Sequence, residues 1–157
     1  MKEKDFFFLK RAIELSCESV TIGGGPFGAV ITKDGEILAE SYNKVTLLND
    51  PTAHAEINVI RIAAQKLGTF DLSGCKIYSS CEPCPMCLGA IYWARLDQLF
   101  FAATRDDAEK IGFDDSFIYS EISRPPKERH IKTVQLLREE ALKAFEAWEE
   151  SEKKVKY

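Results

Sequence analysis

The chain has few of the residues that mark secreted or membrane proteins. Its 157 residues include only five cysteines and two histidines. An odd number of cysteines, two of which fit the metal pattern described below, argues against a disulfide framework and favours a reducing cytoplasm. No apolar run approaches the ~20 residues of a membrane span. The short run Phe6-Phe7-Phe8-Leu9 is followed at once by Lys10 and Arg11, unlike a signal peptide.

Basic residues are also in deficit, since 21 Lys and Arg against 25 Asp and Glu give a net charge of −4. Surfaces that bind nucleic acid usually carry a basic stripe, so this balance disfavours a nucleic-acid partner. The glycines of 23–26 lack the Walker spacing and a following Lys-Ser, which favours a turn into a strand over a phosphate loop. Internal repeats are absent too, and the length fits one domain, 1–157, with a sizeable core.

Two short motifs carry the chemistry of the sequence. The first is His54-Ala55-Glu56, and the second, beginning 84 − 54 = 30 residues later, is Cys84-Pro85-Met86-Cys87 preceded by Pro83. A histidine nitrogen and two thiolates are good zinc ligands, and a catalytic zinc keeps three protein ligands and one open position. We therefore predict one zinc ion per chain, held by His54, Cys84 and Cys87, with Glu56 beside it as a catalytic acid and base.

The spacing also predicts where these residues lie in helices. In the middle of a helix, His54 and Glu56 would point apart, but at the first turn both can face a point beyond the N-terminus. Cys84 and Cys87 share a helix face, and prolines at 83 and 85 fit only a helix start. We expect two helix N-termini to meet at one metal, where their positive ends favour thiolates.

The ligand set suits hydrolysis. Neutral histidine, two thiolates and Zn²⁺ sum to zero charge, and zinc lowers the pKa of a bound water to about 7. Glu56 would take that proton and deliver it to a ring nitrogen and the leaving ammonia. The main alternative is a closed structural site in which Cys81 joins His54, Cys84 and Cys87. That alternative, like a redox Cys-x-x-Cys, gives Glu56 no role.

Alternating strand and helix patterns predict an α/β fold with three layers, a mixed sheet sandwiched between helices. The Asp34-Gly35 pair predicts a hairpin between the first two strands. Cys17 is expected to be buried in the first helix, and His130 to lie on the surface. The expected helices are 5–20, 54–67, 84–95, 104–111 and one after 137; the expected strands are 27–32, 36–41, 75–80, 99–103 and 131–136.

These motifs resemble the cytidine-deaminase-like zinc superfamily, whose signature is H-x-E followed by P-C-x-x-C. Within it the chain is similar to bacterial guanine deaminases, over 24–31, 49–56, 80–93 and 112–119. The resemblance implies hydrolytic removal of an amine from a nucleobase, most specifically the conversion of guanine to xanthine and ammonia. The alternatives are a guanosine or cytosine deaminase, a tRNA adenosine deaminase, and a zinc-stabilised binding module without catalysis.

The resemblance also implies substrate-binding residues. Asn43 offers both a donor and an acceptor to a heterocycle, although as a residue after a strand it also fits a turn. The segment 112–119 is expected to be a loop whose aromatics either plug the core or wall a ring-shaped pocket. Its Asp115 is implied in catalysis and in accepting hydrogen bonds from a purine. The full implied set is Phe27, Asn43, Ala55, Trp93, Asp115 and Tyr157.

The tail of the chain, Lys153 to Tyr157, has too little apolar surface to fold alone and could simply be disordered. It ends in a phenol, however, which can cover a ring and hydrogen-bond it. The resemblance implies a homodimer in which the segment 131–157 is exchanged and Tyr157 reaches the partner's pocket. The expected partners are therefore a small nucleobase and a second copy of the chain, without nucleic acid or membrane.

Overall fold

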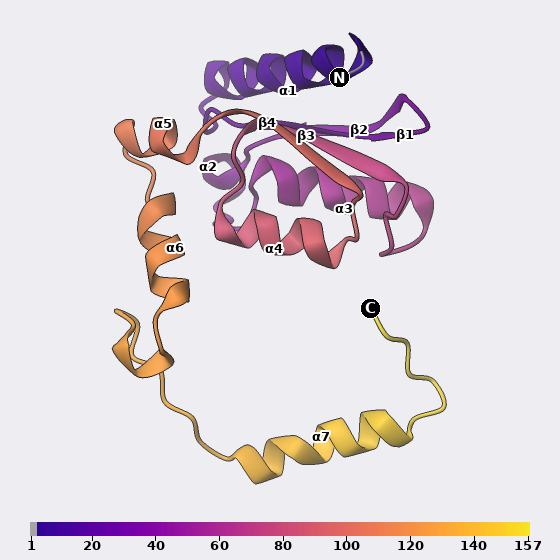
Figure 1. The fold of residues 1–157 in the computed structure, drawn as a ribbon, viewed down its shortest axis with the longest axis vertical. Helices are drawn as coiled ribbons and strands as arrows, with labels where there is room; N and C mark the ends of the chain where they lie inside the picture. The colour runs from indigo at the N-terminus through magenta and orange to yellow at the C-terminus, as the bar shows by residue number, and fades with distance from the viewer. Residues whose placement is uncertain (1–2) are drawn as a thin grey trace.

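The computed structural model describes residues 3–157 as a sheet covered by helices on both faces. Figure 1 shows α1 on one side of the sheet and α3 and α4 on the other, so the predicted three layers are confirmed. Among the described helices, none is both long and apolar enough to cross a membrane. In chain order the elements are α1 Glu3–Thr21, β1 Gly28–Lys33, β2 Glu36–Tyr42, α2 Val45–Leu48, α3 Ala55–Leu67, β3 Cys75–Cys81, α4 Pro85–Trp93, β4 Gln98–Ala103, α5 Arg105–Lys110, α6 Asp115–Ser123, the 3₁₀ turn η1 Pro126–Glu128 and α7 Arg138–Glu150.

The sheet has the strand order β2-β1-β3-β4. β1 pairs antiparallel with both β2 and β3, whereas β3 and β4 are parallel, which makes the sheet mixed as expected. The β1–β2 hairpin turns at Asp34 and Gly35, both with positive φ (53° and 80°), as the Asp-Gly signal predicts. The parallel pair requires a crossover, and α4 supplies it.

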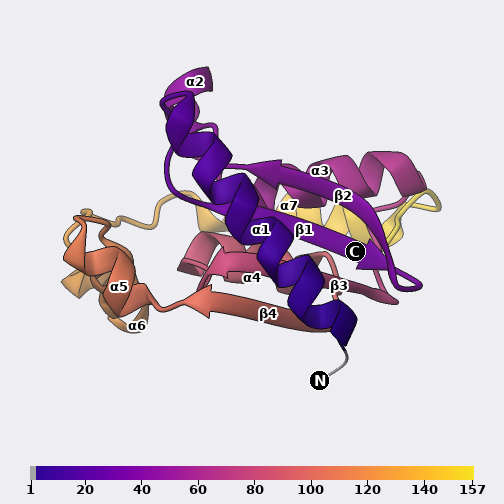
Figure 2. The same cartoon turned by 90° about the horizontal axis from the view of Figure 1, so that it is seen from above.

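The helix α1 lies across the strands on its face of the sheet, as Figure 2 shows. Its buried stripe of Phe8, Ala12 and Leu15 packs against Val30 and Tyr78. Burial of each large apolar side chain stabilises the fold by about 1.5–3 kcal/mol. The helix approaches β1 so closely that a Cβ at Gly28 would lie 2.3 Å from the carbonyl oxygen of Ala12.

The opposite face of the sheet holds the larger core, against α3 and α4. Ile31 and Ile77 from the sheet meet Val59 of α3 and Ile91 of α4, with Leu72 closing the end, and all five are buried. The helix α3 ends at Gly68, whose left-handed conformation caps the last carbonyls. This packing fixes the N-terminal ends of α3 and α4 relative to each other, which matters for the site below.

Three expectations are wrong. The strand expected at 131–136 does not form, because no described strand pairs with these residues. The segment expected as a loop at 112–119 instead starts α6, where Asp114 is the N-cap. Cys17 is exposed, since it lies off the stripe through which α1 contacts the sheet.

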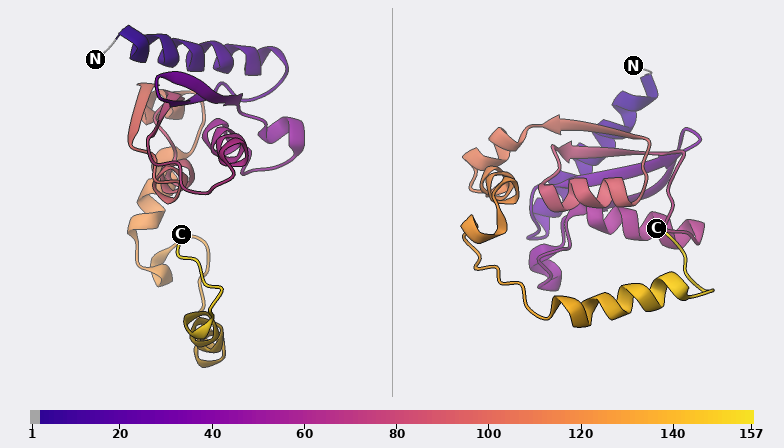
Figure 3. Two further views of the ribbon diagram at one scale, coloured as in Figure 1. Left: turned by 90° about the vertical axis from the view of Figure 1, so that its right-hand side faces the viewer. Right: turned by 60° about the horizontal axis from the view of Figure 1, so that its bottom comes forward.

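The C-terminal helix α7 stands apart from the body of the protein, as Figures 1 and 3 show. None of its residues is buried, and its apolar side chains Phe145 and Trp148 are exposed, Phe145 by 70%. An isolated helix of this length is marginal in water. The helical stripe expected after residue 137 is therefore present, but no other part of residues 3–157 buries it.

Candidate metal centre and active-site cavity

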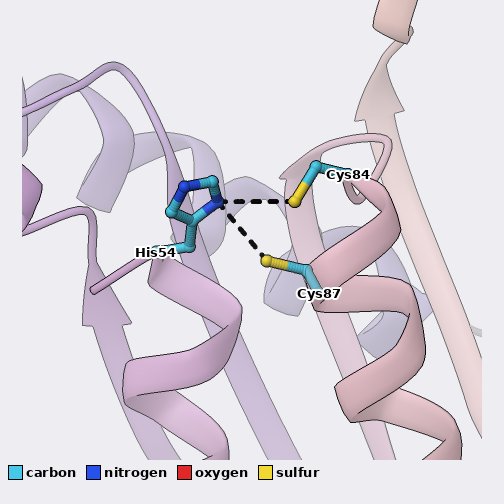
Figure 4. A group of neighbouring side chains, drawn as sticks. All are labelled: His54, Cys84 and Cys87. Carbon is cyan, nitrogen blue, oxygen red and sulfur yellow. Dashed lines mark hydrogen bonds between the residues drawn. The ribbon is translucent and has the colours of Figure 1, made fainter. Parts of the chain in front are cut away.

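Two helix starts face each other at the candidate metal centre. His54 is the N-cap of α3 and Cys84 is the N-cap of α4, with Pro85 in the first turn. Both N-caps have extended backbone (ψ 155° and 167°), which turns their side chains beyond the helix end. Figure 4 shows His54 facing Cys84 and Cys87 across this gap. The predicted meeting of two helix N-termini is confirmed.

The distances between these side chains fit a zinc ion. The Sγ atoms of Cys84 and Cys87 each lie 3.5 Å from Nδ1 of His54, and all three ligand atoms lie within 4.8 Å of one another. Zn–S bonds of ~2.3 Å and Zn–N bonds of ~2.0 Å at a tetrahedral angle place nitrogen and sulfur about 3.5 Å apart. The donor set of one imidazole and two thiolates is also one that zinc prefers. The three residues therefore form a zinc-binding triad.

The thiols of the two cysteines differ in pKa. The Cys87 thiol donates a hydrogen bond to Cys84, which lowers the pKa of Cys84 to about 4. The same hydrogen bond raises the pKa of Cys87. A thiolate, the form that binds metal, is thus already present at Cys84 at neutral pH.

Cys81 lies outside the triad. It ends β3, is buried, and places its Sγ 3.5 Å from the carbonyl oxygen of Thr104. Burial raises its pKa to about 11, so it remains a thiol at neutral pH. Among residues 3–157, the ligand cluster consists of His54, Cys84 and Cys87, which does not fit the four-ligand structural alternative.

Glu56 stands beside the triad without belonging to it. It lies in the first turn of α3, is 5% exposed, and its Oε1 accepts a hydrogen bond of 3.1 Å from Oγ of Ser79 on β3. Burial raises the pKa of its carboxyl group above the usual range. A carboxyl group with a raised pKa both accepts and returns a proton readily near neutral pH.

A cavity of about 410 Å³ opens onto this centre. This volume falls within the range usual for small-molecule sites. Of the residues predicted from the sequence, the cavity brings together Phe27, Asn43, His54, Glu56, Cys84 and Asp115. The cavity therefore joins the metal centre to most of the predicted substrate-binding residues.

An aromatic pair and a carboxylate form one wall of the cavity. The rings of Phe27 and Phe113 meet edge to face, with centroids 4.8 Å apart. Asp115, in the first turn of α6, lies beside them, and partial burial raises the pKa of its carboxyl group. An apolar wall with one acceptor suits a flat heterocycle that carries N–H groups.

Asn43 is a turn residue that also lies at the cavity wall. Its Oδ1 accepts a hydrogen bond from the amide of Val45 (3.1 Å), the pattern of a turn residue, while the residue also lines the cavity. The glycines explain how it fits: a Cβ at Gly25 would approach the side chain of Asn43 to 3.1 Å. The glycine-rich turn thus makes room for this amide at the cavity wall.

The remaining predicted residues lie elsewhere. Ala55 is fully buried behind His54 and does not line the cavity. Trp93 and Tyr157 line a separate hollow of about 590 Å³ along α3 and α4, and their rings lie 5.7 Å apart. Within a single chain, therefore, Trp93 and Tyr157 do not meet the cavity at the metal centre.

Sequence reasoning missed two residues that support the site. Ser79 holds Glu56, and Glu82 accepts a hydrogen bond of 3.1 Å from the amide of Arg105 through its Oε2. A signal for Ser79 was present, since a serine inside a buried strand requires a hydrogen-bond partner. The partner of Glu82 depends on the path of β4 and α5, which no local pattern specifies.

Comparison with known families agrees with this geometry. Residues 2–103 match the family described as the cytidine and deoxycytidylate deaminase zinc-binding region, and this match includes all three ligands. The chain belongs to this family. Glu56 also lies within the matched region.

Individual members of the family extend the similarity. The chain is 57% identical to a guanine deaminase of Bacillus subtilis, over 96% of this chain and 97% of that protein. The crystal structure of guanine deaminase from Bacillus subtilis superposes with a TM-score of 0.94, covering 100% of this chain and 99% of the other. A tRNA-specific adenosine deaminase of Aquifex aeolicus is 41% identical over 62% of this chain and 64% of that protein.

Proposed function

We propose that the protein is a zinc-dependent guanine deaminase, which converts guanine and water into xanthine and ammonia. The observation that carries this proposal is the match to a guanine deaminase along 96% of the chain, at 57% identity. The cavity supports it, because two residues of the metal triad, His54 and Cys84, open onto the same space as the carboxyl group of Glu56 and that of Asp115. As a hydrolysis, the reaction needs no cofactor besides the metal.

Glu56 is assigned the proton transfers. Zinc, when bound at the triad, supplies a water activated for attack on the amine-bearing carbon. Glu56 would accept one proton from that water and pass it to the ring nitrogen, and would then transfer the second proton, from the new hydroxyl group on C2, to the amine as it leaves as ammonia. Ser79 holds one carboxylate oxygen of Glu56, which leaves the other free to exchange protons. Because Glu56 is buried, the proton stays with the reacting atoms instead of bulk water.

Substrate recognition is assigned to the opposite wall. Guanine presents N–H groups around its amine-bearing C2, and the carboxylate of Asp115 would accept hydrogen bonds from them. A base without those donors would leave the half-buried acceptor unpaired, at a cost of about 1–3 kcal/mol. Phe27 offers an aromatic face to the ring, and Asn43 offers its amide to the ring's polar edge. Asp115 is proposed to assist proton transfer as well.

Deamination of an adenosine in tRNA is less well supported. The tRNA-specific relative of Aquifex aeolicus is 41% identical to this chain, against 57% for the guanine deaminase, and the net charge of −4 does not suit a polyanion. Deamination of guanosine or cytosine is disfavoured by the same long match to a guanine deaminase. We place the protein in the cytoplasm, because its five cysteines are free and two of them must stay reduced to bind metal.

A homodimer with exchanged C-terminal segments, 131–157, forms part of the proposal. Phe145 and Trp148 on α7 are exposed apolar side chains, which are typical of a surface that packs on another subunit. The hollow along α3 and α4 is also apolar and could pack against a partner chain. In such a dimer Tyr157 would reach the cavity of the partner, and Trp93 would lie close to the exchanged segment. Each chain would still constitute one domain, 1–157.

The test follows ammonia release from a panel of substrates. Zinc-loaded protein is incubated with guanine, guanosine, cytosine, adenine and a tRNA anticodon stem, and a metal-stripped sample serves as the control. Guanine should react fastest and yield xanthine and ammonia in equal amounts. Ammonia released chiefly from the tRNA stem would replace the proposal by tRNA editing, and no release from any substrate would favour a binding module.

A further inference from the structure

The helix α6 carries Asp115 into the cavity but has little packing of its own. None of its residues is buried, and its N-cap Asp114 makes no capping hydrogen bond with its side chain. A short helix without buried residues is a low-stability element whose position depends on a few specific contacts. Whatever holds α6 in place therefore also decides where Asp115 stands.

One side chain links α6 to the metal loop. Tyr119 donates a hydrogen bond of 3.0 Å from its hydroxyl to the carbonyl oxygen of Pro83, the residue immediately before the ligand Cys84. Tyr119 follows Asp115 by four residues, so both side chains lie on the same face of α6. The tyrosine thus connects the carboxylate of the cavity wall to the cysteine loop through one turn of helix.

Two further contacts brace this link. The guanidinium group of Arg105 lies over the ring of Tyr119, 5.0 Å from its centroid. The backbone amide of Arg105 donates to Oε2 of Glu82, and the amide of Glu82 donates to the carbonyl oxygen of Ala103 at 2.8 Å. The ends of β3 and β4 and the start of α5 are thereby tied together behind Tyr119.

We propose that Tyr119 is a positioning residue that sets the distance between Asp115 and the zinc-binding triad. The hydroxyl fixes α6 to the loop that bears Cys84, and Arg105 prevents the ring from turning away. Tyr119 touches no reacting atom in this assignment; it acts through Asp115. The inference rests on the proposed function only in that guanine turnover is the activity measured.

The first experiment replaces the hydroxyl alone. Tyr119→Phe keeps the ring under Arg105 but removes the hydrogen bond to Pro83, and it should lower kcat/KM for guanine about tenfold. Tyr78→Phe is the matched control, because it also loses a buried hydroxyl bond, of 2.7 Å to Asp5, but on the α1 side of the sheet. The control should lower the melting temperature without changing kcat/KM. An unchanged kcat/KM in Tyr119→Phe would overturn the proposal.

A double-mutant cycle shows whether Tyr119 acts through Asp115. In an Asp115→Ala background, Tyr119→Phe should add little further loss, since there is no carboxylate left to position. If the two losses multiply, Tyr119 supports the site independently of Asp115 and the proposal is wrong. Zinc content, measured in every variant, should remain one ion per chain.

Hydrogen exchange gives a readout that needs no turnover. Amides of α6, such as that of Ile118 bonded to Asp114, should exchange about tenfold faster in Tyr119→Phe, while those of α3 stay protected. Unchanged exchange in α6 would contradict the anchoring role. Should the wild-type protein fail to deaminate guanine while α6 still loosens in the variant, the proposed function falls and the anchor stands.

Discussion

At the scale of single residues, the site separates metal binding from proton transfer. The ligand atoms of His54, Cys84 and Cys87 converge on one metal position. Glu56 instead accepts a hydrogen bond from Ser79 on β3. Glu56 is 5% exposed and lines the cavity, so bulk water has little access to its carboxyl group. Burying a carboxyl group lowers the stability of the folded protein, because burial disfavours its charged form. The position of Glu56 therefore suits an acid and base better than a structural part.

Glu56→Gln should retain zinc and the fold but lose turnover. The amide keeps the shape of the side chain and can still accept from Ser79, but it cannot exchange a proton. Guanine turnover should fall by about two to four powers of ten, the usual scale for a lost general acid and base. Steady-state kinetics, with zinc content and circular dichroism as controls, measure this. Near-normal turnover would remove Glu56 from the mechanism.

The cysteines should separate into two classes. Cys84→Ser and Cys87→Ser should each lose zinc and activity together, because each removes a thiolate from the triad. Cys81→Ser is the matched control, since Cys81 is also buried but its Sγ lies against the Thr104 carbonyl oxygen, outside the triad. It should keep both metal and activity. Loss of zinc from Cys81→Ser, measured by metal analysis after dialysis, would point to a closed four-ligand site.

The triad and Glu56 could be predicted because their chemistry depends on residue types at fixed offsets. His54 and Glu56, or Cys84 and Cys87, lie within four residues of each other, so one helix start fixes their geometry. Ser79 escaped prediction because its contact spans 23 residues and depends on how β3 passes under α3. Local spacing can fix neighbours on one element, but not which elements meet.

At the scale of elements, the approach of α1 to β1 leaves no room for a side chain at residue 28. Gly28 lies against the backbone of α1, where a Cβ would stand 2.3 Å from the Ala12 carbonyl oxygen and 2.6 Å from the amide nitrogen of Ser16. Backbone atoms cannot move aside as a flexible side chain can. The absence of a side chain at residue 28 therefore sets how closely the helix covers the sheet.

Gly28→Ala should destabilise the protein by about 1–3 kcal/mol, the usual cost of overpacking. The helix would have to lift from the sheet, which separates Phe8 and Leu15 from Val30. Thermal unfolding monitored by circular dichroism should show a melting temperature lower by several degrees. Lys10→Ala, on the exposed side of the same helix, is the control and should change stability by less than about 0.5 kcal/mol. Equal stability of the two variants would refute the close approach.

The central elements and α7 could be predicted, whereas the strand expected at 131–136 and the start of α6 could not. Strands 28–33 and 75–81 are buried, α3 carries an apolar stripe, and Pro85 with the two cysteines marks the start of α4. Residues 131–137 have apolar residues of the same kinds, but a strand needs a neighbour, and none lies beside them. The helix α6 was hidden because none of its residues is buried, so it carries no apolar stripe that a sequence pattern could show.

At the scale of the whole molecule, the position of α7 raises the question of what covers it. Its N-cap Leu137 and its apolar residues Phe145 and Trp148 are exposed. The ring of Tyr157 packs against the rings of Phe70 and Trp93. Exposed apolar side chains on an isolated helix are typical of a segment that packs on another subunit. The proposed exchange between two chains would bury the apolar side chains of α7 and the hollow along α3 and α4.

Mixing two inactive chains tests whether the tail acts in the partner's site. One chain carries Glu56→Ala, and the other lacks Lys153 to Tyr157; both are incubated under conditions that allow subunits to exchange. If Tyr157 serves the partner, the truncated chain keeps its own Glu56 and borrows a tail, so guanine turnover returns. At most half of the sites are restored, because the other half carry alanine at residue 56.

A matched mixture provides the control. Combining the truncated chain with a chain that carries Glu56→Ala and also lacks Lys153 to Tyr157 should restore nothing, since no tail is then present. If the first mixture behaves like this control, the tail acts within its own chain or does not act as a lid. Sedimentation of each mixture checks that dimers formed.

The meeting of the two helix starts also has a consequence for folding thermodynamics. His54 and Cys84 are 30 residues apart in the chain, and a cation bound to both closes a loop that contains all of α3 and β3. Because the unfolded chain holds no such arrangement, the cation binds the native state preferentially, and each tenfold rise in its free concentration above Kd should add about 1.4 kcal/mol of stability. Unfolding midpoints measured in zinc buffers should therefore rise with the logarithm of free zinc, so that metal supply sets how often this enzyme opens and is exposed to proteolysis.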